Sequence, residues 1–177
     1  FMSQLKLARE LEEKARRAKK MKEECEKLIE DLRARLDKDE KGGIDVSDAK
    51  KLFENGKKDY DMKDFESALS KFKDAQQLLE RLENEKIDNI ARECDKYLAI
   101  LRDMGKDVSQ YHVEMEQARQ KAREDIEIGL RRFQEIKSEL IGMIIRRLEM
   151  EIDKIKEGLE GIEEEKKREI ESKLSTM

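Results

Sequence analysis

Apolar residues recur along this chain at steps of three and four positions, the spacing that places them on one face of an α-helix. The first such stripe runs from Leu5 to Leu36, and after the second of two interruptions apolar residues persist through Ile170. The middle of the chain keeps unbroken three-four steps, typical of a narrow coiled-coil seam, at Ile87, Ile90, Cys94, Tyr97 and Leu101. The periodicity predicts an all-α protein.

Two short segments interrupt this pattern and predict loops. They are DKDEKGGIDVSD at residues 37–48 and RDMGKDVSQ at 102–110, and in each a Gly is followed two residues later by Asp-Val-Ser. An Asp at such a place can accept hydrogen bonds from the free amides at the start of a helix. Asp45 and Asp107 are therefore the predicted N-caps.

With only these two interruptions, the chain divides into three principal helices, near residues 3–38, 47–103 and 108–174. Short loops make consecutive helices antiparallel neighbours. The first helix is the shortest, so it cannot cover the whole of the second, and segment 84–127 is expected to project. The predicted fold is a single elongated domain over residues 1–177, an antiparallel three-helix bundle with a projecting two-stranded coiled-coil hairpin.

The two loops also open segments that resemble each other. GIDVSDAKKLF begins at residue 43 and GKDVSQYHVEM at residue 105, and with one residue deleted Phe72 then matches Phe133. This similarity indicates an internal duplication with units near 43–80 and 105–141. The sequence leaves open whether the second helix is continuous through residues 59–64.

Small and large packing residues follow a characteristic order across residues 49–75. They are Leu52, Gly56, Tyr60, Phe65, Ala68, Leu69, Phe72 and Ala75. The segment resembles a tetratricopeptide-repeat helical hairpin, set here within a spectrin-like coiled-coil bundle. The resemblance implies a groove for a protein partner, formed by Leu52, Gly56, Tyr60, Phe65, Ala68 and Phe72. A second interpretation is that the same residues are only the packing core of a helix pair.

Composition agrees with an elongated protein, since charged residues make up 47% of the chain and hydrophobic residues only 37%. Cys25 and Cys94 both fall on apolar helical stripes, which is typical of buried thiols in a reducing compartment and favours the cytoplasm. The longest nearly continuous apolar run, LIGMII at 140–145, is far shorter than the roughly 20 residues that cross a bilayer. A membrane-spanning protein is not expected.

The sequence offers no recognisable catalytic chemistry. Its single histidine, His112, and its two cysteines do not have the spacing of a zinc or di-metal site. No Gly-x-Ser-x-Gly elbow and no glycine-rich phosphate loop after a strand is present. We therefore expect no catalytic, cofactor-binding or metal-binding residues, and a protein that is not an enzyme.

One cluster of positive charge stands out, KARRAKKMK at residues 14–22. Its basic residues could contact a nucleic acid or an anionic membrane surface, and they are Lys14, Arg16, Arg17, Lys19, Lys20 and Lys22. Acidic residues flank the cluster on both sides, the chain carries a net charge of -4, and no aromatic residue is interleaved to stack on bases. Binding to either polyanion is the weaker expectation.

The segment LIGMIIRRLEM at residues 140–150 has more apolar residues than a single buried stripe of about 100° requires. The surplus predicts self-association, as a homodimer in which the helices pair antiparallel about a two-fold axis, through Ile141, Ile144, Ile145 and Leu148. The alternative is that the first two helices wrap this segment from both sides.

Together these patterns predict a non-enzymatic scaffold, a protein–protein interaction module built on a rod-like helical bundle with an unidentified protein partner. One alternative is an adaptor that binds a peptide through the tetratricopeptide-like helix pair. The weaker alternative is a binder of nucleic acid or anionic membranes through the basic cluster.

Overall fold

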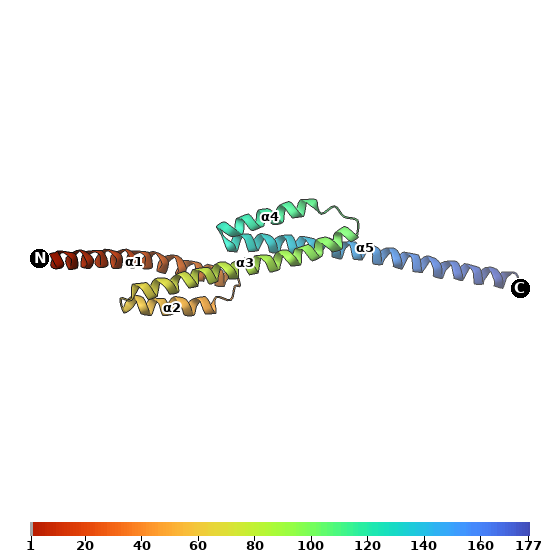
Figure 1. The fold of residues 1–177 in the computed structure, drawn as a ribbon. Coiled ribbons are helices and arrows are strands. Elements are labelled where there is room, and N and C mark those ends of the chain that lie inside the picture. Colours follow the sequence, from red (N-terminus) through yellow and green to blue (C-terminus); the bar gives the residue numbers. More distant parts are fainter. Residues whose placement is uncertain (1) are drawn as a thin grey trace.

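The computed structural model describes residues 2–177, and within that range the chain is all-α, without a strand. The helices are α1 (Met2–Lys41), α2 (Ser47–Asp61), α3 (Phe65–Asp103), α4 (Ser109–Glu124) and α5 (Ile126–Ser175). Figure 1 shows that α1, α3 and α5 run in the same direction along one long axis, each displaced along it from the one before. The short helices α2 and α4 run back beside them.

Helix α3 is shared between two packed regions. Its first half packs against the end of α1 and against α2, and its second half packs against α4 and the start of α5 (Figure 1). Ion pairs mark both overlaps of the parallel long helices, since Arg35 of α1 binds Glu83 of α3 and Lys137 of α5 binds Glu93 of α3. The two ends of the described chain therefore lie at opposite ends of an elongated molecule.

Two of the three predicted long helices are broken in the structure. The first break follows Asp61, where Lys63 adopts a left-handed backbone conformation with φ of 64° and Asp64 caps α3 by accepting from the Ser67 amide at 3.1 Å. The second break is Asp125, an extended residue whose carboxylate accepts from the amide of Glu127 at 3.0 Å. Each Asp satisfies amides that a new helix start leaves free, so the chain can turn without Gly or Pro.

The structure does not confirm a single three-helix bundle with a projecting hairpin. Residues 84–127 do not project, because the first half of α5 covers the second half of α3 together with α4. The coiled-coil seam of α3 is consequently buried, and Cys94 and Leu101 are 0% exposed. The narrow three-four spacing had indicated one partner helix, whereas this stretch of α3 faces two.

The two predicted loops are present and share one geometry. A glycine with positive φ ends the preceding helix in each, Gly43 at 75° and Gly105 at 78°. The amide of the next residue then bonds back to the helix, from Ile44 to the Asp39 carbonyl and from Lys106 to the Leu101 carbonyl, both at 3.0 Å. This is the hydrogen-bonding pattern of a glycine-terminated helix.

The N-caps lie one residue later than predicted. Helix α2 begins at Ser47, so Val46 occupies the cap position and provides no side-chain hydrogen bond. Asp45 instead accepts from the Ser47 amide at 3.1 Å, forming a local turn before the helix. Asp107 and Ser109 repeat this arrangement before α4, at 3.0 Å.

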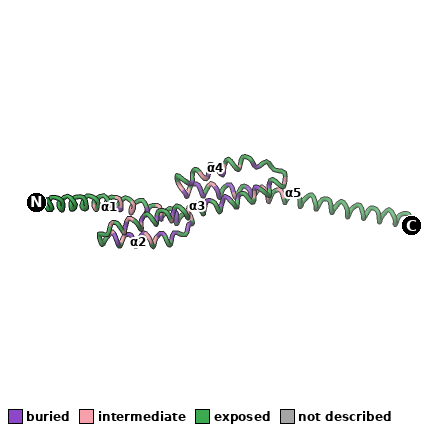
Figure 2. The backbone as a smooth tube through the Cα atoms, viewed as in Figure 1, coloured by how far each residue is buried: buried purple, intermediate pink, exposed green. Residues whose placement is uncertain are grey.

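Buried residues are confined to the middle of the chain, between Cys25 and Leu140 (Figure 2). Residues 2–24 of α1 and residues 141–175 of α5 contain no buried residue. Within residues 2–177 no helix combines the length and the apolar character needed to cross a bilayer.

Candidate interaction surfaces

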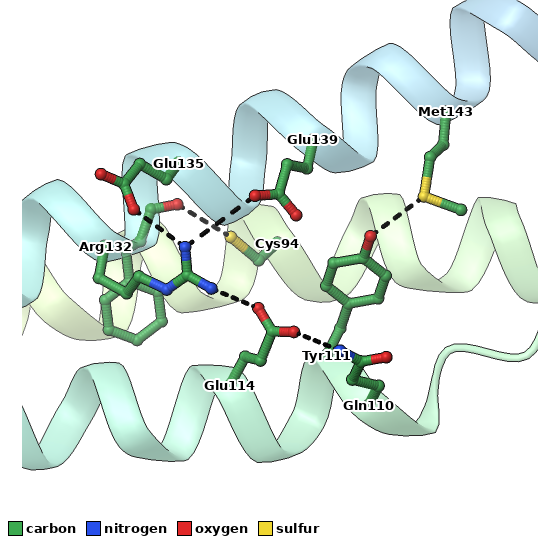
Figure 3. Close-up of polar contacts among 9 residues, drawn as sticks. Cys94, Gln110, Tyr111, Glu114, Arg132, Glu135, Glu139 and Met143 are labelled. Carbon is green, nitrogen blue, oxygen red and sulfur yellow. Dashed lines mark hydrogen bonds and ion pairs between the residues drawn. The ribbon is translucent and has the colours of Figure 1, made fainter.

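A polar cluster fixes the first half of α5 against α4 (Figure 3). Arg132 of α5 donates to Glu114 of α4 at 2.6 Å and to Glu135 at 2.9 Å. Farther along, the Tyr111 hydroxyl of α4 lies 3.2 Å from the Met143 sulfur. These links hold α5 in place as far as Met143, after which the helix continues beyond the bundled region.

A second polar cluster joins α1 to α3 and to the α4–α5 turn. Arg35 donates two hydrogen bonds to the Glu83 carboxylate, at 2.7 and 2.6 Å, and Lys38 reaches Asp125 at 3.1 Å. Asp39 lies beside them, 0% exposed, and its carboxylate oxygens have no hydrogen-bond partner among the described residues. Burial, and next the negative charge of Glu83, raise the pKa of the Asp39 carboxyl to about 7.

The structure brings the residues of the predicted partner groove together, in the packing of α1, α2 and α3. Gly56 is buried so closely against Phe72 that a Cβ atom on residue 56 would lie 2.7 Å from the ring. Helix α1 covers this region, since Glu26 accepts a 2.7 Å hydrogen bond from the Tyr60 hydroxyl. Three of the six residues are buried: Gly56, Ala68 and Phe72. The other three are half-buried: Leu52, Tyr60 and Phe65.

All six residues of the basic cluster are exposed, on the part of α1 that precedes its first buried residue. Within residues 2–177 only Lys22 among them forms an ion pair, with Glu26 at 3.7 Å. A helix turns by about 100° per residue, so six basic residues spread over positions 14–22 point to all sides of α1. The cluster therefore forms a ring of charge and not a single basic face.

The residues predicted for self-association lie where α5 leaves the bundled region. Ile141 and Ile144 are half-buried, whereas Ile145 is 49% exposed and Leu148 is 44% exposed. The predicted second helix, residues 47–103, reaches α5 through α3, which packs against the first half of α5. The first predicted helix, α1, meets α5 near its start, where Lys38 pairs with Asp125.

The exposed apolar stripe of α5 is longer than the predicted self-association segment. The exposed apolar residues continue past Leu148 at three-four steps, and each is 44–63% exposed. We call this set the α5 seam: Ile145, Leu148, Ile152, Ile155, Leu159 and Ile162. The signal was available in the spacing, but only the structure shows that no other described helix lies against this part of α5.

The two cysteines and the histidine lie on three different helices, α1, α3 and α4. Cys25 and Cys94 are free thiols at 0% exposure, as their positions on apolar stripes predicted. Burial raises the pKa of both thiols, to about 11 for Cys94. His112 is exposed, and among residues 2–177 no group of three His, Cys, Asp or Glu side chains could hold a metal ion.

Comparison of the chain with protein-family models, with curated proteins and with solved structures found no match.

Proposed function

We propose that this chain is a non-enzymatic scaffold, an interaction module that holds two binding ends apart and docks a helical partner along the α5 seam. The observation that carries this proposal is the exposure of six large aliphatic side chains at coiled-coil spacing on an otherwise charged helix. Burying apolar surface is favourable by about 25 cal/mol per Å². A continuous exposed stripe of this kind is typical of a protein interface.

The arrangement of the long helices supports a role as a spacer. Helix α5 has 50 residues and α3 has 39, and at 1.5 Å per residue these correspond to about 75 Å and 58 Å. Because the helices overlap in parallel along one axis, their lengths extend the molecule (Figure 1). An ion pair and apolar packing in each overlap limit bending between the two ends.

Site-specific photocrosslinking in the cells that make the protein tests this function. A benzophenone amino acid at Ile155, on the seam, should give defined protein adducts, because the probe lies inside the docking surface. The matched probe at Glu157, on the opposite face of the same turn, should give few. Equal labelling from the two positions, or none from Ile155, would contradict the proposal.

One observation favours a second candidate function. The exposure of the basic cluster on α1, with a single ion pair, leaves its charges available to a polyanion. Binding to duplex DNA or to anionic vesicles would have to fall steeply with salt and disappear when all six residues are neutralised. The ring-like distribution of the charges favours the scaffold, because one flat or linear polyanion reaches only part of them.

The tetratricopeptide-like helix pair remains an alternative adaptor site, but in this structure it is covered. Its Gly56–Phe72 contact is already filled, and α1 lies over the pair through Glu26 and Tyr60. Peptide binding there would require α1 to move.

We also infer an internal duplication, supported by the identical hydrogen bonds of the two loops. A reducing compartment such as the cytoplasm is inferred as well, supported by the two buried free thiols.

A further inference from the structure

We propose that the α5 seam pairs with the α5 seam of a second copy of this chain, forming a parallel two-stranded coiled coil beyond the bundled region. This inference rests on the proposed docking function and names its partner. It changes the self-association predicted from the sequence in two respects, because the contact moves toward the C-terminal end of α5 and the two helices run parallel.

The α5 seam repeats a pattern that is covered elsewhere in the same molecule. Shifting five buried residues of α3 by 61 positions places them on five of the six seam residues. The pairs are Ile87 and Leu148, Ala91 and Ile152, Cys94 and Ile155, Leu98 and Leu159, and Leu101 and Ile162. The five α3 residues are 0–7% exposed because α5 and α4 lie over them. By its register, the α5 seam is a surface of the kind that another helix covers.

A second copy supplies a matching surface. In heptad notation Ile145, Ile152 and Leu159 occupy the a positions, and the remaining seam residues occupy the d positions. All six are large and aliphatic, so such helices can interlock without placing a charge in the core. Ile145 at a with Leu148 at d is the combination that favours two strands, whereas Ile at d in the next two heptads favours larger assemblies, so a mass of three or four chains would overturn the two-stranded form. The first part of α1 is the other uncovered helix, and it is a poorer match because its stripe consists mainly of small residues, Ala8, Ala15 and Ala18.

The rest of the molecule favours the parallel orientation. In an antiparallel pair centred on the seam, Ile162 of one copy would face Ile145 of the other. The residues after Ile162 would then run back beside the part of α5 that ends at Ile144, where α3 and α4 already pack. In a parallel pair the same residues continue away from both bundled regions.

Charge at the edges of the seam is compatible with this orientation. Glu151 and Lys156 occupy the g and e positions that meet between parallel helices, so each copy's Glu151 faces the other's Lys156. Within residues 2–177 Lys156 has no ion-pair partner, and Glu151, which pairs with Arg147 of its own helix at 3.2 Å, has a second carboxylate oxygen for this contact. The pair then adds specificity to the apolar contacts of the core.

Sedimentation equilibrium of the full chain tests the association. The wild type should have twice the chain mass of 21.0 kDa, and the double variant Ile152→Glu/Ile155→Glu should have half the wild-type mass. Met150→Glu is the matched control, since it adds the same charge to a 54% exposed apolar residue on the opposite face. It should remain dimeric. A monomeric wild type, a dimeric double variant or a dissociated Met150→Glu would each overturn the proposal.

Cysteine substitution tests the orientation. Ile162→Cys should form a disulfide-linked dimer on mild oxidation, because a parallel pair places the two Cys side by side. In the antiparallel pair they would be about 25 Å apart, seventeen residues at 1.5 Å each. Crosslinking only in a mixture of Ile145→Cys and Ile162→Cys chains would show the antiparallel form and overturn this proposal. The wild type is the control for this experiment. Its two native thiols are buried, so mild oxidation should not crosslink it.

Two further outcomes separate this inference from the function on which it rests. Leu11→Glu should leave the dimer intact, and a dimer that it dissociates would show that α1 of the second copy is the occupant. A monomeric wild type whose Ile155 crosslinks to a different protein would leave the docking function standing and remove the second copy as its partner.

Discussion

Gly129 of α5 lies directly against the backbone of Ala122 in α4. A Cβ atom on residue 129 would be 2.3 Å from the Ala122 Cβ atom and 2.6 Å from the Ala122 amide nitrogen. No side chain fits between these helices, because a single residue, Asp125, joins them. The contact explains why the break occurs where the sequence pattern indicated a continuous helix.

Gly129→Ala should therefore destabilise the fold by about 1–3 kcal/mol, the range for a methyl group forced into a packed site. The added methyl meets backbone atoms, which cannot move aside as a flexible side chain would. Urea unfolding followed by circular dichroism measures the change. Gly161→Ala is the matched control, since nothing lies within 4 Å of its added Cβ atom, and it should raise helix stability by about 1 kcal/mol. Equal stabilisation by both substitutions would disprove the close contact.

Asp39 should make stability depend on pH in an unusual direction. Its folded pKa of about 7 is above the ordinary value near 3.9, so the folded state binds the proton more tightly than the unfolded state. The stabilisation from this proton is fully present below about pH 4 and is lost as the pH rises through about 7. At pH 8 the buried charge should cost on the order of 2 kcal/mol or more.

Asp39→Asn tests this dependence, because the amide has nearly the same shape and does not titrate. The free energy of unfolding of the variant, relative to the wild type, should rise between pH 5 and pH 8. Asp39→Leu should be at least as stable as the wild type at pH 8, since Leu101 occupies the same place before the second loop and is fully buried. A difference that does not change with pH would rule out titration of Asp39.

Asp125 should contribute to stability mainly as the cap of α5. Its carboxylate accepts from the amides of Glu127 and Ile128, and the hydrogen bond from Lys38 holds its pKa below the usual value. Asp125→Ala should cost about 1–2 kcal/mol, whereas Asp125→Asn retains the cap and should cost less than about 1 kcal/mol. Thermal unfolding compares the two, and an Asn variant as unstable as the Ala variant would assign the effect to Lys38 instead.

The two cysteines should report separately on the two packed regions. Both thiols are buried and have raised pKa values, so at pH 8 neither should react with a disulfide reagent until the surrounding helices open. Gly129→Ala lies in the second region and should speed the labelling of Cys94 more than that of Cys25. Mass spectrometry of the modified peptides distinguishes the sites. Equal acceleration at both would mean that the regions open together.

The sequence predicted the helices and the two glycine loops because their signals are local. Apolar spacing defines a helical stripe, and a positive φ at Gly43 and Gly105 requires a residue without a side chain. The break at residues 62–64 has no such residue, since Lys63 takes up the left-handed conformation. The break at Asp125 depends on the contact between Gly129 and Ala122, which forms when α4 and α5 pack side by side. The spacing of apolar residues did not predict it.

The candidate docking surface was predicted only in part for a related reason. Spacing identifies which face of a helix is apolar, but it does not say which other helix covers that face. Leu101 and Ile162 have similar positions in the sequence pattern, yet Leu101 is 0% exposed and Ile162 is 51% exposed. The difference lies in the stagger of the long helices, which sets where each overlap ends.

The sharing of α3 between the two regions has a mechanical consequence. Tension applied at the two chain ends passes from α1 to α5 through the parallel overlaps with α3, while α2 and α4 lie beside that path (Figure 1). Each overlap is then loaded in shear, so its contacts must break together and cannot open one after another. Pulling the two chain termini apart in an optical trap should give higher rupture forces than pulling α4 sideways off α5 through linkers attached to the two ends of α4. The molecule is thus arranged to resist stretching along its axis while its short helices remain easy to peel away.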